Sequence, residues 1–216
     1  MREHQEKVPY LYILEKFQEQ SLQELCKGKG LTYDESRNVI TVKLMSENYD
    51  VYYPSGKVFK EDGSEVTSYL LKTVILRYIV NGKGTKPTFR FISYKEIQDG
   101  QVYYPNFYKR TIKRLAQLYD HDPTLFDFPD KLERLPMSRG DLSFTFEFLP
   151  HVYFQFILYR GDDEFPAGAT ILMDANTEDY FNAEDLAVVV DIAIEYFVHK
   201  GTIPPDLGMY HFKESY

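Results

Sequence analysis

Hydrophobic residues recur at two different spacings in the first part of the chain, and the two spacings predict different elements. Leucine and phenylalanine recur at about every third or fourth position over residues 10–26, which predicts an amphipathic helix. Apolar and polar residues alternate over residues 37–60, where short turn segments begin at Ser46 and Pro54. The alternation therefore predicts a β-meander directly after the first helix.

The middle of the chain has a helical pattern interrupted by one short extended stretch. Residues 64–80 are apolar almost all round, which predicts a largely buried helix. An extended stretch is expected at 88–93 and a further helix at 106–119. An irregular region rich in Asp and Pro follows, as far as Pro136.

The last third returns to alternation and then to helical spacing. Strands are expected at 142–148, 151–159 and 169–173, and a final helix at 183–199. The tail, residues 202–216, contains Pro204-Pro205 and is expected to wrap the surface.

These elements predict one α+β domain with a largely antiparallel mixed sheet flanked by helices. Its parts are an N-terminal helix and β-meander (10–60), a helical middle (64–135) and a C-terminal β-unit with its helix (142–199). The chain has 19 Tyr and 16 Phe but no Trp, and these aromatic residues suit half-buried antiparallel strands. A length of 216 residues is enough to bury a core without a disulfide or a structural metal.

Charge and cysteine content exclude several classes of protein. The net charge of -8 argues against nucleic acid and against an anionic membrane surface, because basic patches supply most of that affinity. The single cysteine, Cys26, excludes an intrachain disulfide and a cysteine-ligated iron–sulfur cluster within this chain. The charged start lacks the apolar core of a signal peptide, so we expect a cytoplasmic protein.

Carboxylates are concentrated in residues 160–185. The candidate ligands for a divalent metal, and for a metal-dependent hydrolase, are the last five of these acids: Asp174, Glu178, Asp179, Glu184 and Asp185. Asp174, Asn176 and Glu178 match the first, third and fifth positions of a calcium loop, and Asp185 matches the twelfth. The sixth position is Asp in place of Gly, and a strand in place of a helix leads in.

The same acids also have a structural interpretation. Asn182 can cap the final helix, and acids in its first turn favour the positive helix N-terminus. The earlier group, Asp162 to Glu164, lies about 20 Å from Asp174 along an extended strand and is expected to form a solvated turn. Both interpretations, metal site and helix cap with turn, remain open from the residues alone.

The final helix carries Asp191, Glu195 and His199 at spacings that place them on one face. A carboxylate–carboxylate–imidazole metal site could be built from them. The other faces of this helix are apolar, and a helix on a soluble domain needs a polar stripe facing solvent. We expect these residues to form that stripe.

A basic cluster is the alternative candidate for a binding site. It consists of Lys109, Arg110, Lys113 and Arg114 on the helix predicted at 106–119. Such a cluster can receive a phosphate, a carboxylate or the acidic face of a protein partner. It can also be a solvated face that pairs with acids close in sequence, namely Asp120, Asp122, Asp127 and Asp130.

Motifs of nucleophilic catalysis are missing. The chain has no Gly-x-Ser-x-Gly elbow and no Walker or dinucleotide fingerprint. The glycine–lysine segments at Lys27 and Gly82 follow predicted helices and are expected to end them.

Several segments of the chain resemble an uncharacterised prokaryotic domain family typical of anaerobic bacteria and archaea. The most specific is Tyr159-Arg-Gly-Asp-Asp-Glu-Phe-Pro-Ala, and the resemblance covers most of residues 66–190. The other segments are Phe91-Ile-Ser-Tyr-Lys-Glu-Ile, Asp99-Gly-Gln-Val-Tyr, Leu135-Pro-Met-Ser-Arg-Gly-Asp, Leu149-Pro-His-Val, Leu172-Met-Asp and Glu184-Asp-Leu-Ala.

The resemblance implies a binding or accessory protein of redox or corrinoid and one-carbon metabolism, acting through a protein partner. Some members of that family carry an additional cysteine-rich iron–sulfur segment, which this chain lacks. The resemblance supplies no catalytic residues. A non-enzymatic binding protein is therefore the first expectation, and the metal-dependent hydrolase and a binder of small anionic ligands are the alternatives.

Overall fold

The N-terminal helix expected at 10–26 is divided into two in the structure, a computed structural model that describes residues 2–129 and 131–208. Helix α1 spans Arg2–Glu19 and α2 spans Leu22–Cys26. Ser21 and Glu24 form a capping box, in which the Ser21 hydroxyl accepts from the Glu24 N–H and the Glu24 carboxylate accepts from the Ser21 N–H. This pair of hydrogen bonds begins a new helix and so separates α2 from α1.

The predicted β-meander is present and gains one strand at its start. The strands are β1 (Thr32–Asp34), β2 (Val39–Leu44), β3 (Glu47–Tyr52) and β4 (Lys57–Lys60), and they pair antiparallel in sequence order. The meander is followed by helix α3 (Tyr69–Asn81), which is capped by Ser68 and largely buried as the sequence predicts.

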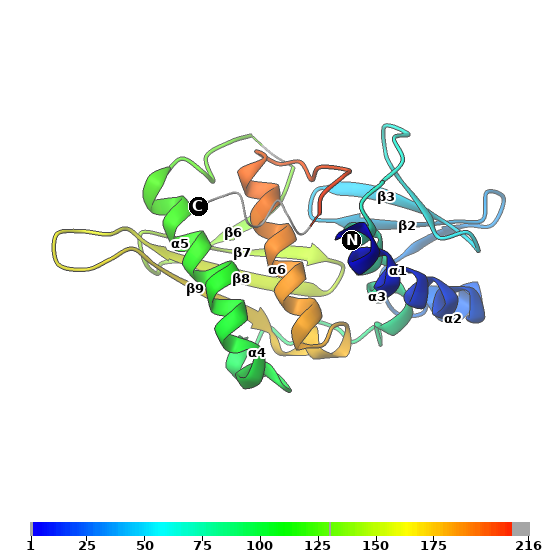
Figure 1. The fold of residues 1–216 in the computed structure, drawn as a ribbon, viewed down its shortest axis with the longest axis horizontal. Helices are drawn as coiled ribbons and strands as arrows, with labels where there is room; N and C mark the ends of the chain where they lie inside the picture. Colours follow the sequence, from blue (N-terminus) through cyan, green and yellow to red (C-terminus); the bar gives the residue numbers. More distant parts are fainter. Residues whose placement is uncertain (1, 130, 209–216) are drawn as a thin grey trace.

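A long helical segment then crosses the molecule after the short strand β5 (Phe91–Ser93) and the 3₁₀ turn η1 (Tyr94–Glu96). It runs through α4 (Gly100–Phe107), one π-helical turn, η2 (Tyr108–Ile112), and α5 (Lys113–His121). Figure 1 shows these three parts as one continuous rod lying across the second sheet.

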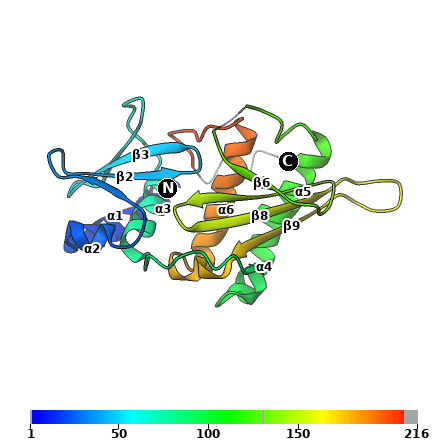
Figure 2. The ribbon, with the colours of Figure 1, turned by 180° about the vertical axis from the view of Figure 1, so that it is seen from behind.

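The second sheet has the strand order β5-β9-β8-β7-β6 within the described residues, and every pairing is antiparallel. Its remaining members are β6 (Arg134–Pro136), β7 (Leu142–Leu149), β8 (Val152–Tyr159) and β9 (Gly168–Asp174), followed by the 3₁₀ turn η3 (Ala175–Asp179) and helix α6 (Ala183–Val198). Helices α5 and α6 cover one face, and the view from behind shows the other face without helices (Figures 1 and 2). The covered face is aromatic, with Phe144, Phe146 and Phe156 packed around Phe197 of α6.

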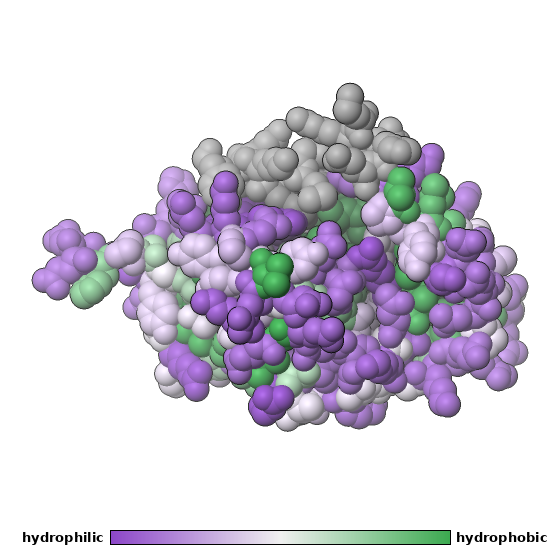
Figure 3. Space-filling view, turned by 60° about the horizontal axis from the view of Figure 1, so that its bottom comes forward, coloured by the Kyte–Doolittle hydropathy of each residue, from purple (hydrophilic) through white to green (hydrophobic). Residues whose placement is uncertain are grey.

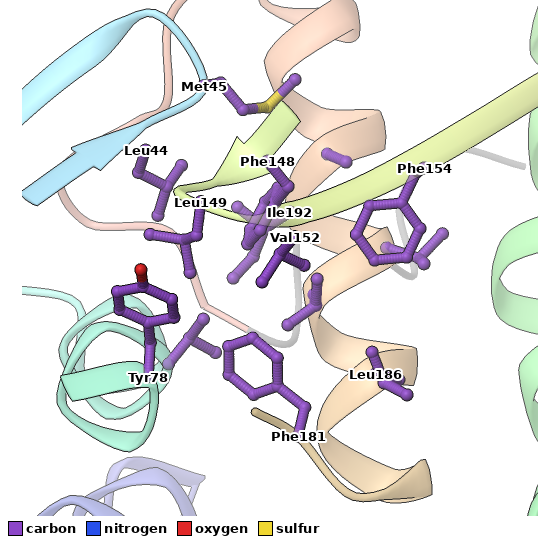
Figure 4. Close-up of a cluster of buried hydrophobic side chains, with 14 of the residues drawn as sticks. Leu44, Met45, Tyr78, Phe148, Leu149, Val152, Phe154, Phe181, Leu186 and Ile192 are labelled. Carbon is purple, nitrogen blue, oxygen red and sulfur yellow. The ribbon is translucent and has the colours of Figure 1, made fainter. Parts of the chain in front are cut away.

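One hydrophobic core joins the two sheets. Met45, in the turn after β2, donates its N–H to the carbonyl of Phe148 on β7 at 2.7 Å. Around this contact, side chains from the meander, α3, the β7–β8 turn and α6 point toward one another (Figure 4). The predicted α+β fold is confirmed, with two antiparallel sheets in place of one mixed sheet.

The described part of the tail, residues 202–208, lies against the rest of the chain. Ile203 and Leu207 are buried, and the Pro205 carbonyl accepts the N–H groups of Thr67 and Ser68. The rest of the expected surface-wrapping tail, 209–216, lies outside the described residues. None of the described helices is long and apolar enough to cross a bilayer.

Candidate functional site

The two arginines of the predicted basic cluster face inward, toward helix α6. Arg110 forms an ion pair with Asp191, and Arg114 forms one with Glu195. Arg110 and Arg114 are four residues apart, and so are Asp191 and Glu195. The two ion pairs therefore lie about one helical turn apart on both segments. We refer to Arg110, Arg114, Asp191 and Glu195 as the arginine–carboxylate ladder.

The ladder corrects the sequence expectation for Asp191 and Glu195. Both were expected on a solvent stripe, but both are buried, and so is Arg114 of the basic cluster. The rod of α4, η2 and α5 packs on the face of α6 that carries the acids, and its arginines compensate for that burial. Of the expected stripe, only His199 is exposed, and its Nε2 lies 3.2 Å from the Glu195 carboxylate.

The acids that follow the basic cluster in the sequence make contacts of their own. Asp122 accepts from the Thr124 side chain and forms an ion pair with Lys200 at 3.7 Å. Asp120 accepts the N–H of Gly161 from the β8–β9 hairpin at 2.9 Å. Asp127 lies in the described loop after α5, and Asp130 lies outside the described residues.

Lys109 and Lys113 are exposed, so the predicted four-residue cluster is divided between an inner and an outer face.

The π-helical turn η2 holds Arg110 between Asp191 and an open cavity. A π turn inserts one residue into the helical register and often marks a functional position. The Thr111 hydroxyl donates to the Phe107 carbonyl at 2.7 Å within this turn. Arg110 therefore leaves the long helical rod at the point where its regular geometry is interrupted.

The cavity beside Arg110 has a volume of about 220 Å³. Helices α1, α3, α4 and α6 surround it, together with η1 and η2. Its lining comprises Glu6, Pro9, Leu70, Thr73, Val74, Arg77, Tyr94, Tyr103, Asn106, Arg110, Glu184, Asp185, Ala187 and Val188. Apolar and aromatic groups thus form most of the walls, and a few charged groups converge between them.

Arginines and carboxylates both line this cavity. Arg77 forms an ion pair with Asp185, as Arg110 does with Asp191. The Arg77 and Arg110 side chains are 26% and 21% exposed, whereas those of Asp185 and Asp191 are 4% and 0% exposed. Asp185 and Asp191 are thus buried partners of two partly exposed arginines, and a ligand in the cavity would meet these guanidinium groups together with the carboxylates of Glu6 and Glu184.

Two tyrosines complete the cavity. Tyr94 stacks on Phe107 with ring centroids 3.8 Å apart and donates its hydroxyl to the Ala183 carbonyl at 2.6 Å. Burial, with a smaller contribution from Tyr103, raises the pKa of Tyr94 to about 12, so its hydroxyl stays protonated. Tyr103 is 40% exposed and stands at the cavity with Asn106.

Burial raises the pKa of Asp191 to about 7, against the opposing influence of Arg110 and Arg114. Its Oδ1 atom is buried and has no hydrogen-bond partner among residues 2–129 and 131–208. The carboxylate behind the cavity therefore lies close to the point where it exchanges a proton at neutral pH.

The predicted metal ligands are divided among separate structural contacts. Asp174 is buried and accepts from the Thr88 N–H, the Thr88 hydroxyl and the Asn176 N–H at 3.1, 2.7 and 3.0 Å, and also from the Phe89 N–H. Glu178 accepts the Gln98 N–H at 2.5 Å.

The other three acids have different neighbours. Asp179 binds Lys83 and Thr85 at 2.7 Å each, Asp185 pairs with Arg77, and Glu184 stands exposed at the cavity. The described part of the chain contains no group of three or more His, Cys, Asp or Glu residues that could hold a metal ion. A bound divalent metal stays a prediction that metal analysis of the purified protein can test.

Two other features of residues 160–185, the cap of the final helix and the acidic turn, form as the sequence suggests. Asn182 caps α6 by accepting the Asp185 N–H at 2.9 Å. Asp162 accepts the N–H groups of Glu164 and Phe165 at 2.9 and 2.7 Å, which makes the β8–β9 connection an exposed, acid-rich turn. These contacts favour the structural interpretation of both groups.

Arg77 is the residue of the cavity that the sequence pattern did not reveal. It is one of two cations on α3, a helix that is otherwise largely apolar and buried. A cation within a buried helix needs a partner or a functional reason, and this was the available signal. The identity of the partner, Asp185, required the fold.

Comparison with known proteins gives one match. No curated protein and no solved structure shows significant similarity to the chain. A family described as "Domain of unknown function (DUF3786)" matches residues 21–196, which include both sheets and the cavity residues from Leu70 onward. Because this match covers most of its length, the chain belongs to the DUF3786 family of domains of unknown function.

Proposed function

We propose that this protein binds a small organic acid with an apolar body in the cavity between α1, α3, α4 and α6. The observation that carries the proposal is the pair of guanidinium groups, Arg77 and Arg110, each paired with a buried carboxylate and each lining the same cavity. An arginine already fixed by a carboxylate loses little conformational entropy when it binds an acidic group.

The size and lining of the cavity suit a ligand of that class. A volume of about 220 Å³ exceeds the roughly 150 Å³ of a cavity known to bind benzene, so a single ring with a carboxylate fits. Val74, Val188 and Tyr103 would contact the apolar body, and Asn106 offers an amide. Walls that are mostly apolar with a few placed polar groups are typical of small-molecule sites.

The test compares benzoate with benzyl alcohol, which has a similar shape and no charge. Benzoate is expected to raise the thermal unfolding midpoint as its concentration increases, because a ligand that binds only the folded state stabilises it. Benzyl alcohol is expected to give little shift. Val188→Phe, which fills the cavity without changing its charge, should abolish the benzoate effect.

Arg77→Gln should also abolish the benzoate shift, measured against the variant's own midpoint. Arg37→Gln is the matched control, because Arg37 forms an exposed ion pair with Asp50 at 3.1 Å far from the cavity. An equal benzoate shift in wild type, Val188→Phe and Arg77→Gln would contradict the proposal.

The location, partner and metabolic setting of the protein are a separate part of the proposal. A cytoplasmic location is part of this proposal, because a single cysteine suits a reducing compartment. The anaerobic setting, the protein partner and the link to redox or corrinoid and one-carbon metabolism follow from the sequence resemblance. Co-purification with corrinoid-dependent or redox enzymes of the same cell would test the partner and the metabolic link.

A further inference from the structure

The outer edge of strand β9 is paired at one end only. Strand β5 pairs with residues 172–174 of β9, whereas Gly168 to Ile171 pair with β8 alone within the described chain. We refer to residues 168–171 on the side away from β8 as the open edge. A free strand edge presents backbone donors and acceptors that can pair with another chain.

Hydrogen bonding to β5 shows which backbone groups face this side. The N–H of Ala175, just after β9, donates to the Arg90 carbonyl at 2.9 Å and therefore points toward β5. Backbone groups of alternate residues in a strand point the same way. Counting back in twos, the N–H and C=O groups of Ile171 and Ala169 point to the same side. Ile171 is buried, whereas Ala169 is half-buried and lies beyond the end of β5.

Pairing on the other side leads to the same result. The Leu158 carbonyl accepts the Asp141 N–H at 2.9 Å, so Leu158 faces β7. Its two neighbours on β8 consequently face β9, where they lie opposite Gly168 and Thr170. Ala169 is left facing outward, and its donor and acceptor are available to a further strand.

A groove of about 720 Å³ runs beside this edge. Tyr108, Ile112 and Ala116 form its wall on η2 and α5, and Phe165 and Ala169 lie on the other side. Tyr108 and Phe165 are 44% and 67% exposed. A strand added to β9 would direct alternate side chains into this apolar groove.

Acidic groups dominate one end of the groove. Asp120, Asp162 and Asp163 line it, opposed by Lys113 as the only base of the lining. The hairpin that carries Asp162 and Asp163 extends beyond the body of the molecule and is mostly hydrophilic (Figures 1 and 3). Positive charge on a partner would be attracted to this end.

We infer that an extended peptide of a partner protein adds to the open edge as a strand antiparallel to β9. The peptide continues the line of β5, so its C-terminal end lies beside the hairpin and carries basic residues. Its alternate apolar side chains enter the groove between Ile112 and Phe165. This peptide site is separate from the cavity and does not depend on the proposed ligand.

The experiment measures binding of a fluorescent peptide, Thr-Val-Thr-Val-Arg-Arg with blocked ends, to the full chain by anisotropy. A second peptide has the same side chains but N-methyl groups on alternate residues that face β9. Strand addition requires those N–H donors, so the methylated peptide should bind at least about tenfold more weakly. Equal binding of the two peptides, or no binding of the first, would overturn the inference.

Two variants examine the protein side. Ala169→Pro removes an outward N–H and leaves the β8 pairing in place, so affinity should fall about tenfold while the circular dichroism spectrum is retained. Asp163→Lys, an exposed change in the hairpin, should weaken binding about threefold and reduce its salt dependence. If the chain is a dimer that Ala169→Pro dissociates, the occupant of the edge is a second copy, and the peptide assignment is wrong.

Discussion

The Asp174 carboxylate ties the loop before β5 to the start of η3. It accepts hydrogen bonds from Thr88 and Phe89 in the loop before β5 and from Asn176 at the start of η3. The side chain is fully buried. Asp174, at the end of β9, thus anchors the loop that precedes β5. A buried carboxylate is stable in this position because it accepts several hydrogen bonds.

Replacing this anchor should be costly. Asp174→Ala leaves the N–H of the buried Asn176 and those of Thr88 and Phe89 without this acceptor, and the free energy of unfolding is expected to fall by about 3 kcal/mol. Asp162→Ala is the control, because Asp162 also accepts two N–H groups, but in an exposed turn, and should cost less than about 1 kcal/mol. Urea denaturation measures both values.

The same comparison with and without a chelator separates an anchor from a metal ligand. If hydrogen bonds account for the effect, the difference between wild type and Asp174→Ala is unchanged by removal of divalent metal. A difference that disappears in the chelator would instead support the metal site predicted from the sequence.

Individual residues were predicted well where a local rule applied and poorly where burial decided. Asn182 as a helix cap follows from its place before an apolar helical run. Asp191 and Glu195 were expected in solvent, because a helix pattern cannot show that a second helix supplies arginines to that face. Their burial depends on contacts between residues 81 positions apart.

At the scale of elements, long periodic segments were predicted, and two of the short strands were missed. The sequence located α3, α6, β7, β8 and β9 to within a few residues, apart from the later start of α3. Strands β1 and β6 have three residues each, which is too short for a period to be recognised. The rod of α4, η2 and α5 was predicted only in its second half, because Gly100 and Pro105 weaken the helical signal.

The arginine–carboxylate ladder makes the free energy of unfolding depend on pH through Asp191. An acid whose pKa is raised on folding binds more protons in the folded state than in the unfolded state. For Asp191 the relevant window runs from about 4, its unfolded pKa, to about 7. Its contribution to stability is therefore fully present below about pH 4 and is lost as pH rises through about 7.

Asp191→Asn should remove this dependence, because an amide does not titrate. Relative to the variant, the wild-type protein is expected to lose stability between about pH 4 and pH 7. Urea midpoints at several pH values measure the difference. Asp122→Asn serves as control, since the Thr124 hydroxyl lowers the pKa of Asp122 in its exposed turn, and the effect of Asp122 on stability therefore has the opposite sign. A constant difference between wild type and Asp191→Asn across the window would contradict the assignment.

At the scale of the whole molecule, the two sheets share contacts that a modular protein would lack. The Tyr78 hydroxyl lies within hydrogen-bond distance of the carbonyls of Lys29 and Pro150, at 2.7 and 2.9 Å, and the Tyr196 hydroxyl lies 2.7 Å from the Ser46 hydroxyl. Leu149 and Val152 of the second sheet lie close to Leu44 of the first (Figure 4). A continuous core of this kind favours cooperative unfolding.

Single tryptophans can test that cooperativity, because the chain has none of its own. Tyr52→Trp places a probe on β3 of the first sheet, and Tyr159→Trp places one at the end of β8 in the second. Both fluorescence transitions in urea should coincide with the loss of far-ultraviolet circular dichroism. Phe148→Ala, introduced at the junction, should lower both midpoints together by about 3–5 kcal/mol of stability. Two separate midpoints, with only one affected by Phe148→Ala, would show that the sheets unfold as independent units.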